Sequence, residues 1–220
     1  MQEKIIRVTG QATIQVVPDV IRLKLYLNSI HETYEEAYVL AKSNTDKLSA
    51  IMKILDLPAS LPKTTSLDID KREQAERDQH NNIIGVKFLG FRLMHHVKMD
   101  LDMDTVLLNK IIKLIGKELK QAEISIGYTV KDPRPLQLKM LEMAGRDAKE
   151  KAIVLTDALG CKLGSVKSID YSETEISIYS EAREIHGAAE AACCNKESLD
   201  ISPDDLSVSD SVNVEWYIED

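Results

Sequence analysis

The chain has 220 residues, of which 28 are lysine or arginine and 36 are aspartate or glutamate, so its formal net charge is −8. Hydrophobic residues make up 44% and charged residues 29%, a composition that excludes disordered and fibrous proteins. The acidic balance argues against nucleic acid and anionic membrane surfaces as partners, because phosphate contacts require clustered basic side chains.

No targeting segment or membrane span is predicted. The first ten residues alternate like a β-strand and lack the apolar stretch of a signal peptide. Nowhere do 18 apolar residues follow one another without a charge, so we expect a soluble chain with no span. A chain whose signal peptide had been replaced by Met1 would begin in the same way, so the sequence leaves the cellular location open.

Three cysteines, Cys161, Cys193 and Cys194, exclude a fully paired disulfide framework within one chain. The adjacent pair could form only a strained vicinal disulfide. A redox switch is one interpretation of this pair. Two incidental thiols in a polar loop are favoured, because there is no CxxC spacing and no nearby basic cluster that would lower a thiol pKa.

The N-terminal elements follow from alternation and capping. Apolar runs at 4–9 and 11–17 flank Gly10, and we expect them to form a hairpin. Alternating apolar residues predict a half-buried strand over 21–28. A helix is expected over 33–56, opened by a threonine and a glutamate in capping-box spacing.

The same rules predict strands over 64–70 and 84–101, followed by a helix over 103–117 that is opened by Asp102 or Asp104. A strand over 122–130 comes next, and then a helix that starts after Pro133 and Pro135 and ends at Gly160. The last predicted strands are 166–178 and 207–219. A phase slip within 166–178 suggests a bulge. The third helix has a predicted buried stripe of Leu141, Ala144, Ala148, Ala152, Leu155 and Leu159.

Two polar excursions interrupt this pattern. Residues 71–82 are predicted as a solvated hairpin tip or the outer end of a long β-arm, and 180–203 as a loop. The resulting order, βββαββαβαββ, predicts an α+β fold with a mixed, largely antiparallel sheet and about three packed helices. We interpret 1–220 as a single unit, with two subdomains as the alternative.

Possible chemical sites have simpler structural explanations. His95 and His96 are adjacent on a predicted strand, so they point to opposite faces and cannot share a metal ion. Segment 160–164, GCKLG, follows a helix and lacks the GK[ST] end of a phosphate loop, so a helix cap and tight turn are favoured. No nucleophile elbow is visible.

Charged clusters also favour structural roles. Basic residues of the third helix alternate with acidic ones, which predicts a salt-bridged wet face that includes Arg146, Lys149 and Lys151. Paired carboxylates lie at strand ends or turns, where solvated carboxylates and helix caps are favoured over a hydrolytic or metal site: Asp68/Asp70, Asp100/Asp102/Asp104, Glu173/Glu175 and Asp204/Asp205. We therefore predict no catalytic, cofactor-binding or metal residues and no cofactor.

Five segments occur in an order and spacing that carry a family resemblance: IRVTGQATIQVVPD at 6–19, TYEEA at 33–37, LGFRLMHHVKMDLD at 89–102, AGRDAKEKAIVLTDALGCKLGSV at 144–166 and ISPDDLSVSDSVNVEWYI at 201–218. Together they resemble the SIMPL-domain family, which includes bacterial periplasmic immunogenic antigens, envelope stress proteins and an animal adaptor of a pelle-like kinase. Phe91 stands where members commonly have tyrosine, and Asp204 where they commonly have glycine.

The resemblance implies an α+β fold, no established catalytic activity, a tendency to form higher oligomers, and a role in the bacterial envelope or in resistance to oxidative stress. We therefore expect a non-enzymatic homo-oligomer in the periplasm or cell envelope. A cytosolic adaptor that binds a partner protein is the alternative. A hydrolase or metalloenzyme that uses the paired carboxylates is a third hypothesis.

Overall fold

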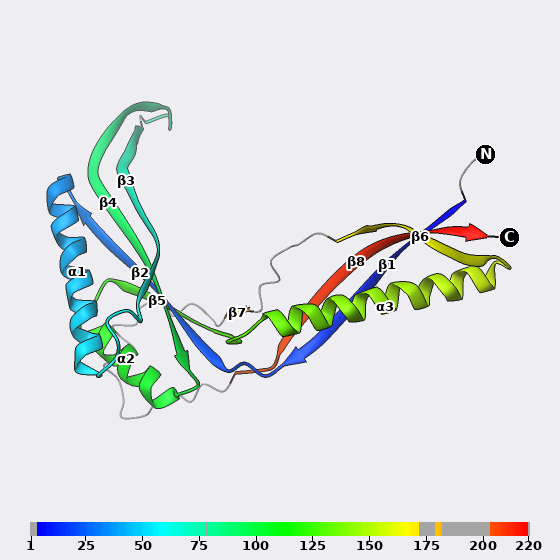
Figure 1. The fold of residues 1–220 in the computed structure, drawn as a ribbon. Coiled ribbons are helices and arrows are strands. Elements are labelled where there is room, and N and C mark those ends of the chain that lie inside the picture. Colours follow the sequence, from blue (N-terminus) through cyan, green and yellow to red (C-terminus); the bar gives the residue numbers. More distant parts are fainter. Residues whose placement is uncertain (1–3, 78, 172–178, 182–202, 220) are drawn as a thin grey trace. The chain divides into compact units, whose positions relative to one another are not determined.

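The computed structural model of the chain describes residues 4–77, 79–171, 179–181 and 203–219 (Figure 1). It contains two compact units. The first comprises Met1–Asp19, Thr129–Ser180 and Pro203–Asp220, and the second comprises Val20–Tyr128 and Glu181–Ser202. Helices and strands joined by antiparallel pairing confirm the predicted α+β class. The interpretation of 1–220 as a single unit stays a prediction.

The first unit is a three-stranded antiparallel sheet covered by one long helix. The strands β1 (Ile5–Val16), β8 (Leu206–Glu219) and β6 (Lys162–Asp170) lie in the order β1-β8-β6, and α3 (Arg134–Ala158) packs mainly on β1 and β8. β1 pairs with β8 along its whole length, from Ile5 opposite Tyr217 to Val16 opposite Leu206. This continuous register places alternate residues of both strands against the helix.

The predicted hairpin at Gly10 is wrong, because 5–16 form one uninterrupted strand. Gly10 is instead the point where α3 crosses β1. A Cβ atom at Gly10 would lie 2.0 Å from the Ala144 carbonyl oxygen and 2.6 Å from the Ala148 backbone nitrogen. The glycine is therefore required by the close approach of the helix backbone, and not by a turn.

The buried stripe of α3 has a strict four-residue spacing. Ala144, Ala148 and Ala152 are buried as predicted, and Met140 and Thr156 extend the stripe at its two ends. The prediction that Leu155 and Leu159 belong to it is wrong, since they are 47% and 74% exposed. Small side chains at every fourth position let the helix lie close to the sheet, and the leucines fall on another face.

α3 also covers the outer edge of β1. The Gln11 backbone N–H donates to the Asp147 carboxylate at 2.7 Å, and the Lys151 ammonium reaches the Thr9 carbonyl oxygen at 3.4 Å. Asp147 and Lys151 form an ion pair with each other at 2.6 Å. Backbone groups of an edge strand otherwise offer a template for further pairing, so these two side chains protect the edge.

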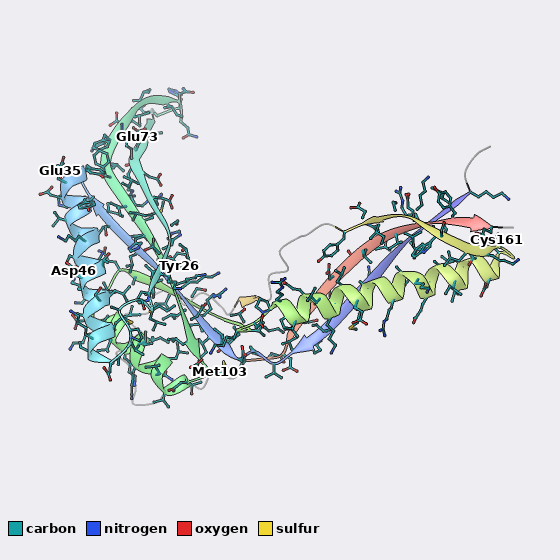
Figure 2. All side chains as sticks on the ribbon, in the orientation of Figure 1. Tyr26, Glu35, Asp46, Glu73, Met103 and Cys161 are labelled. Atoms are coloured by element: carbon teal, nitrogen blue, oxygen red, sulfur yellow. The ribbon has the colours of Figure 1, made fainter. Side chains whose placement is uncertain are left out.

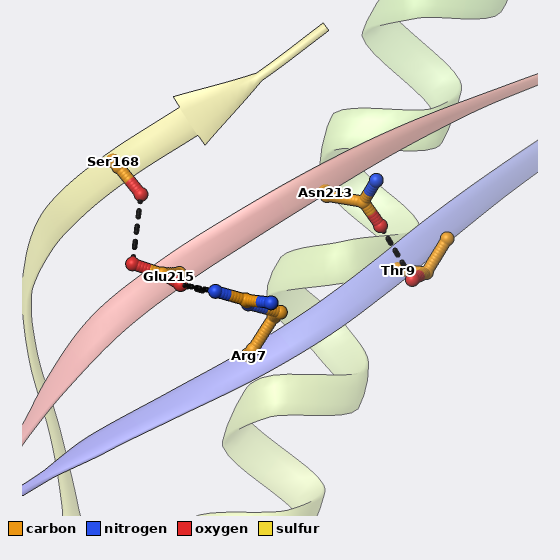
Figure 3. A network of polar contacts seen from close by, with 5 residues as sticks. All are labelled: Arg7, Thr9, Ser168, Asn213 and Glu215. Atoms are coloured by element: carbon orange, nitrogen blue, oxygen red, sulfur yellow. Dashed lines mark hydrogen bonds and ion pairs between the residues drawn. The ribbon is translucent and has the colours of Figure 1, made fainter.

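The face of this sheet that points away from α3 is a polar ladder (Figure 3). Arg7 donates to the Glu215 carboxylate through Nε at 2.7 Å, and Ser168 donates to the other oxygen of that carboxylate at 3.0 Å. Thr9 donates to the Asn213 side-chain oxygen at 2.6 Å. These residues alternate with Val8, Val212 and other buried residues, as a strand with one wet face requires.

β6 carries register shifts between Leu163 and Val166 and between Val166 and Ser168. The bulge that the sequence predicts falls within 166–178, and residues 172–178 of that range lie outside the described residues. The polar 180–203 stretch lies almost entirely outside them as well, with Cys193 and Cys194.

The second unit contains a sheet in which β3, β4, β2 and β5 lie in that order, with two helices. Its elements are β2 (Val20–His31), α1 (Tyr34–Ile54), β3 (Lys63–Arg77), β4 (Ile83–Asp102), α2 (Thr105–Glu118) and β5 (Ala122–Thr129). The short β7 (Tyr179–Glu181) lies where the sequence passes from the first unit to the second. The core contains Leu23 and Leu25 of β2, Ile51 of α1 and Ile111 of α2, all without exposed surface. No helix among the described residues is long and apolar enough to cross a membrane.

Caps begin both helices of this unit. Thr33 accepts from the Glu36 backbone N–H, which confirms Thr33 as the predicted N-cap. The Glu36 carboxylate accepts from the Thr33 hydroxyl at 2.7 Å, whereas in a full capping box it accepts from the backbone N–H of the cap residue. Asp104 accepts from the Leu107 N–H at 2.9 Å and so begins α2. The sequence left Asp102 and Asp104 as alternatives, and the structure assigns the cap to Asp104.

β3 and β4 form a long antiparallel hairpin, so residues 71–82 are the outer end of a β-arm, as one of the two interpretations proposed (Figure 1). A register shift between Arg72 and Glu73 marks a bulge on β4 at Leu89 and Gly90. Gly90 has φ of 119°, and a Cβ atom there would lie 2.3 Å from the His31 carbonyl oxygen. The bulge therefore depends on glycine where the arm leaves the rest of the sheet.

We expect Gly10→Ala to destabilise the chain by about 1–3 kcal/mol, because the added methyl group meets helix backbone that cannot move aside locally. Gly145→Ala in α3 is the matched control, since a Cβ there meets nothing within 4 Å. This control should be neutral or gain up to about 1 kcal/mol from helix propensity. Urea unfolding followed by circular dichroism measures both, and equal stability of the two variants would contradict the crossing at Gly10.

Stability should also fall in acid. A hydrogen bond from Lys151 lowers the pKa of Asp147, and one from Arg7 lowers the pKa of Glu215. Each carboxyl has a lower pKa in the folded chain than in the unfolded chain. Its contribution to the free energy of unfolding is therefore complete above about pH 4, and it is lost as the pH falls through the pKa of the folded chain. We expect the Tm to drop below about pH 4.

The double variant Asp147→Asn, Glu215→Gln should flatten that drop, because neither position then titrates. Thermal unfolding across the acid range measures the slope for both proteins. An equally steep drop in the double variant would assign the acid sensitivity to other carboxylates.

Candidate functional site

His95 and His96 lie on opposite faces of β4, and each has its own partner on β3. The Thr64 hydroxyl is 2.8 Å from His95 Nε2, and the Ser66 hydroxyl is 3.1 Å from His96 Nδ1. The Tyr26 ring meets His96 edge to face. Burial lowers the pKa of His95, and the neighbouring His96 lowers it further. Both imidazoles thus take part in strand packing.

Several of the carboxylates that the sequence singled out make separate structural contacts. Asp100 accepts two hydrogen bonds from Arg22, at 2.7 and 2.8 Å, and this contact lowers the Asp100 pKa. Asp70 pairs with Arg92 across the β3–β4 hairpin at 3.1 Å. The Asp205 backbone N–H donates to the Asp204 side chain. Glu173 and Glu175 lie outside the described residues.

No three histidine, cysteine, aspartate or glutamate side chains within the described ranges gather as a metal site. Gly160 follows α3 with φ of 71°, which agrees with the predicted helix cap. Gly164 belongs to β6, so the predicted tight turn at this position is wrong. A Cβ atom at Gly164 would meet the Tyr217 carbonyl oxygen at 2.9 Å, so β8 passes close to it. Cys161, labelled in Figure 2 just after α3, is a partly exposed free thiol.

The most distinctive surface of the second unit is an apolar strip along the β-arm. The core face of β4 continues past the cover of α1. Leu93, 1% exposed at the base, is opposite Ile69, which is 45% exposed on the edge strand. Farther out, Phe88 and Val86 of β4 lie opposite Glu73 and Ala75 of β3, and they are 48% and 61% exposed.

Register places these residues on one face. Positions 67, 69, 73 and 75 alternate along β3, and Phe88 and Val86 are the partners of the outer two. The bulge adds its extra residue on β4 alone, so β3 keeps its alternation across it, while the positions of β4 on this face change from 93 and 91 to 88 and 86. The core face of the sheet therefore extends onto the arm as a surface in water.

Aromatic contacts tie this strip to the start of α1. Phe88 and Phe91 meet edge to face with ring centroids 5.3 Å apart, and Phe91 meets Tyr34 in the same way at 6.0 Å. Tyr34 stacks with Tyr38 one helical turn on. Figure 2 shows where this region lies, with Glu35 labelled at the start of α1 and Glu73 on the arm.

We call this surface the arm patch and define it by its six exposed residues: Tyr34, Tyr38, Leu67, Ile69, Val86 and Phe88. An exposed apolar surface with aromatic side chains is typical of a protein-binding site. Lys71 and Glu73 lie on the same face of the arm and supply one charge of each sign.

Sequence reasoning missed the arm patch because it treated 71–82 as solvated and 84–101 as an ordinary strand. A signal was present. Val86 and Phe88 alternate like core residues, yet they lie close in sequence to the polar tip, where no predicted helix was available to cover them.

Comparison with known proteins places the chain in a family. A family model described as SIMPL, a protein of unknown function (DUF541), matches residues 6–216. No curated protein matches the sequence. The match spans nearly the whole chain and both units, and it includes the strands and helices from β1 to β8. The chain therefore belongs to the SIMPL family.

Proposed function

We propose that the protein is a non-catalytic assembly protein that associates with further copies of itself through the arm patch. The observation that carries this proposal is the extension of a core-like face, with aromatic side chains, onto a hairpin arm in water. Burying such a surface against another protein is favourable by about 25 cal/mol for each Å² of apolar area removed from water.

The charges beside the patch support a second copy as the occupant. Lys71 and Glu73 are two positions apart on the same face of β3. Two copies related by a two-fold axis can bring each lysine to the partner's glutamate, and both ion pairs then form together. The tendency of the family to form higher oligomers, implied by the resemblance, agrees with this choice.

We also propose that the assembly works in the bacterial envelope or periplasm and contributes to oxidative stress tolerance. This part of the proposal rests on the family resemblance. A cytosolic adaptor role would use the same patch for a different protein, so the oligomeric state separates the two functions.

The first test substitutes the outer part of the patch. Val86→Asp with Phe88→Asp should convert an oligomer into a chain with the monomer mass of 24.7 kDa. Both residues are exposed, so the fold should tolerate the change. Light scattering after size-exclusion chromatography measures the mass over a range of concentrations.

Lys87→Asp is the matched control. Lys87 lies between the two substituted residues and points to the opposite face of the arm. Its substitution by aspartate changes the net charge by −2, as the double variant does. It should keep the oligomer. A monomeric wild-type chain at high concentration would contradict self-association and favour binding of a different protein.

The second test concerns stress. A strain of the native host that lacks the gene should be more sensitive to peroxide than its parent, and a plasmid copy should restore tolerance. Lys87→Asp should restore it and the Val86→Asp, Phe88→Asp variant should not, because only the latter loses assembly. Equal tolerance of the deletion strain and its parent would remove the stress role while leaving the light-scattering result intact.

A further inference from the structure

The first unit has a groove that the arm patch does not involve. α3 packs mainly on β1 and β8 and covers less of β6. Val166 and Ile169 of β6 lie on the sheet face that carries the helix. Ile169 is nevertheless 66% exposed. Between these two side chains and the flank of α3 lies a groove of about 790 Å³, with the buried ring of Trp216 in its lining. This volume is in the range of small-molecule sites.

The lining is apolar with one charge. Lys149 of α3 is the only charged residue among those that line the groove. Its neighbours on the helix are paired, Arg146 with Glu142 and Lys151 with Asp147. In the part of the chain that the structure describes, Lys149 has no such ion pair, so the predicted salt-bridged face does not include it.

Gly145 keeps the wall of the groove open one turn before Lys149. It lies in the interior of a long helix, where glycine is less stable than alanine by about 1 kcal/mol. A Cβ atom at Gly145 would meet nothing within 4 Å, so no close contact among the described residues requires a glycine there. Because glycine has no side chain, the groove is open at this position.

We propose that this groove binds a free long-chain carboxylate. The alkyl chain lies along Ile153, Val166 and Ile169 over Trp216, and the carboxylate accepts a charge-assisted hydrogen bond from the Lys149 ammonium. The proposal is independent of self-association, because the arm patch belongs to the other unit.

Trp216 gives a direct readout, because it is the single tryptophan of the chain and lines the groove. Titration of the full chain with dodecanoate below its micelle concentration should change the Trp216 emission saturably, with one equivalent bound. Dodecanol, which has the same chain and no charge, should bind about tenfold more weakly, since it lacks the charge-assisted contact.

Two variants locate the ligand. Lys149→Met should weaken dodecanoate binding about tenfold and leave dodecanol unchanged. Gly145→Leu should abolish binding of both, because its side chain enters the groove, while Gly145→Ala should retain most of it. Circular dichroism and urea unfolding of each variant verify the fold. Because both substitutions at Gly145 improve helix propensity, loss of binding with retained stability assigns the effect to the groove.

Several results would overturn the proposal. These are no saturable response to dodecanoate, undiminished binding by Gly145→Leu, and a response only to micelles or phospholipid vesicles. Equal weakening of dodecanoate and dodecanol by Lys149→Met would overturn the assignment of the head group. A smaller particle mass for Gly145→Leu in light scattering, without ligand, would show that a second copy covers the groove. Because the arm patch belongs to the other unit, we expect Gly145→Leu to keep the particle mass of the wild-type chain.

Discussion

The close crossing of α3 over β1 at Gly10 sets the geometry of the first unit. Backbone meets backbone there, because glycine faces a stripe of alanines and a single methyl group would collide with the helix. Dispersion and apolar burial depend on such contact distances, so a helix seated this close gains packing along its whole length. This crossing also determines where the remaining faces of α3 lie.

Two properties of the first unit follow from the position of α3 on the sheet. One flank of α3 is brought over the edge of β1, where Asp147 and Lys151 bond to backbone groups that would otherwise be open to another strand. The opposite flank covers β6 only in part, so apolar residues of this strand border a groove. A protected edge and an open groove are thus two consequences of placing one helix on a sheet of three strands.

Much of this architecture was predictable, and the errors have physical causes. Alternation predicted β2 and β8, because one face of each strand is buried and the other is wet. The helix cap at Thr33 and its contact with Glu36 are local, so sequence spacing was sufficient to find them. Gly10 was misassigned because a glycine required by a close approach and one required by a turn look alike in sequence. Leu155 and Leu159 were misassigned because hydrophobicity alone does not say which stripe of a helix the sheet accepts. The arm patch was missed for a related reason, since Val86 and Phe88 follow a core pattern in a place where the helix cover has ended.

The two exposed apolar surfaces differ in ways that suit different ligands. The arm patch is built on a hairpin, carries several aromatic rings in contact with one another, and has charges of both signs beside it. Such a surface is buried best by another broad surface, where aromatic side chains contribute much of the binding free energy. The groove is concave, its lining carries one positive charge, and its floor includes a buried ring. A flat partner could not fill it and would leave Lys149 desolvated without a counter-charge, at a cost in free energy. A narrow ligand with an apolar body and one negative group meets both requirements, and this difference in shape and charge is why we assign the two surfaces to different occupants.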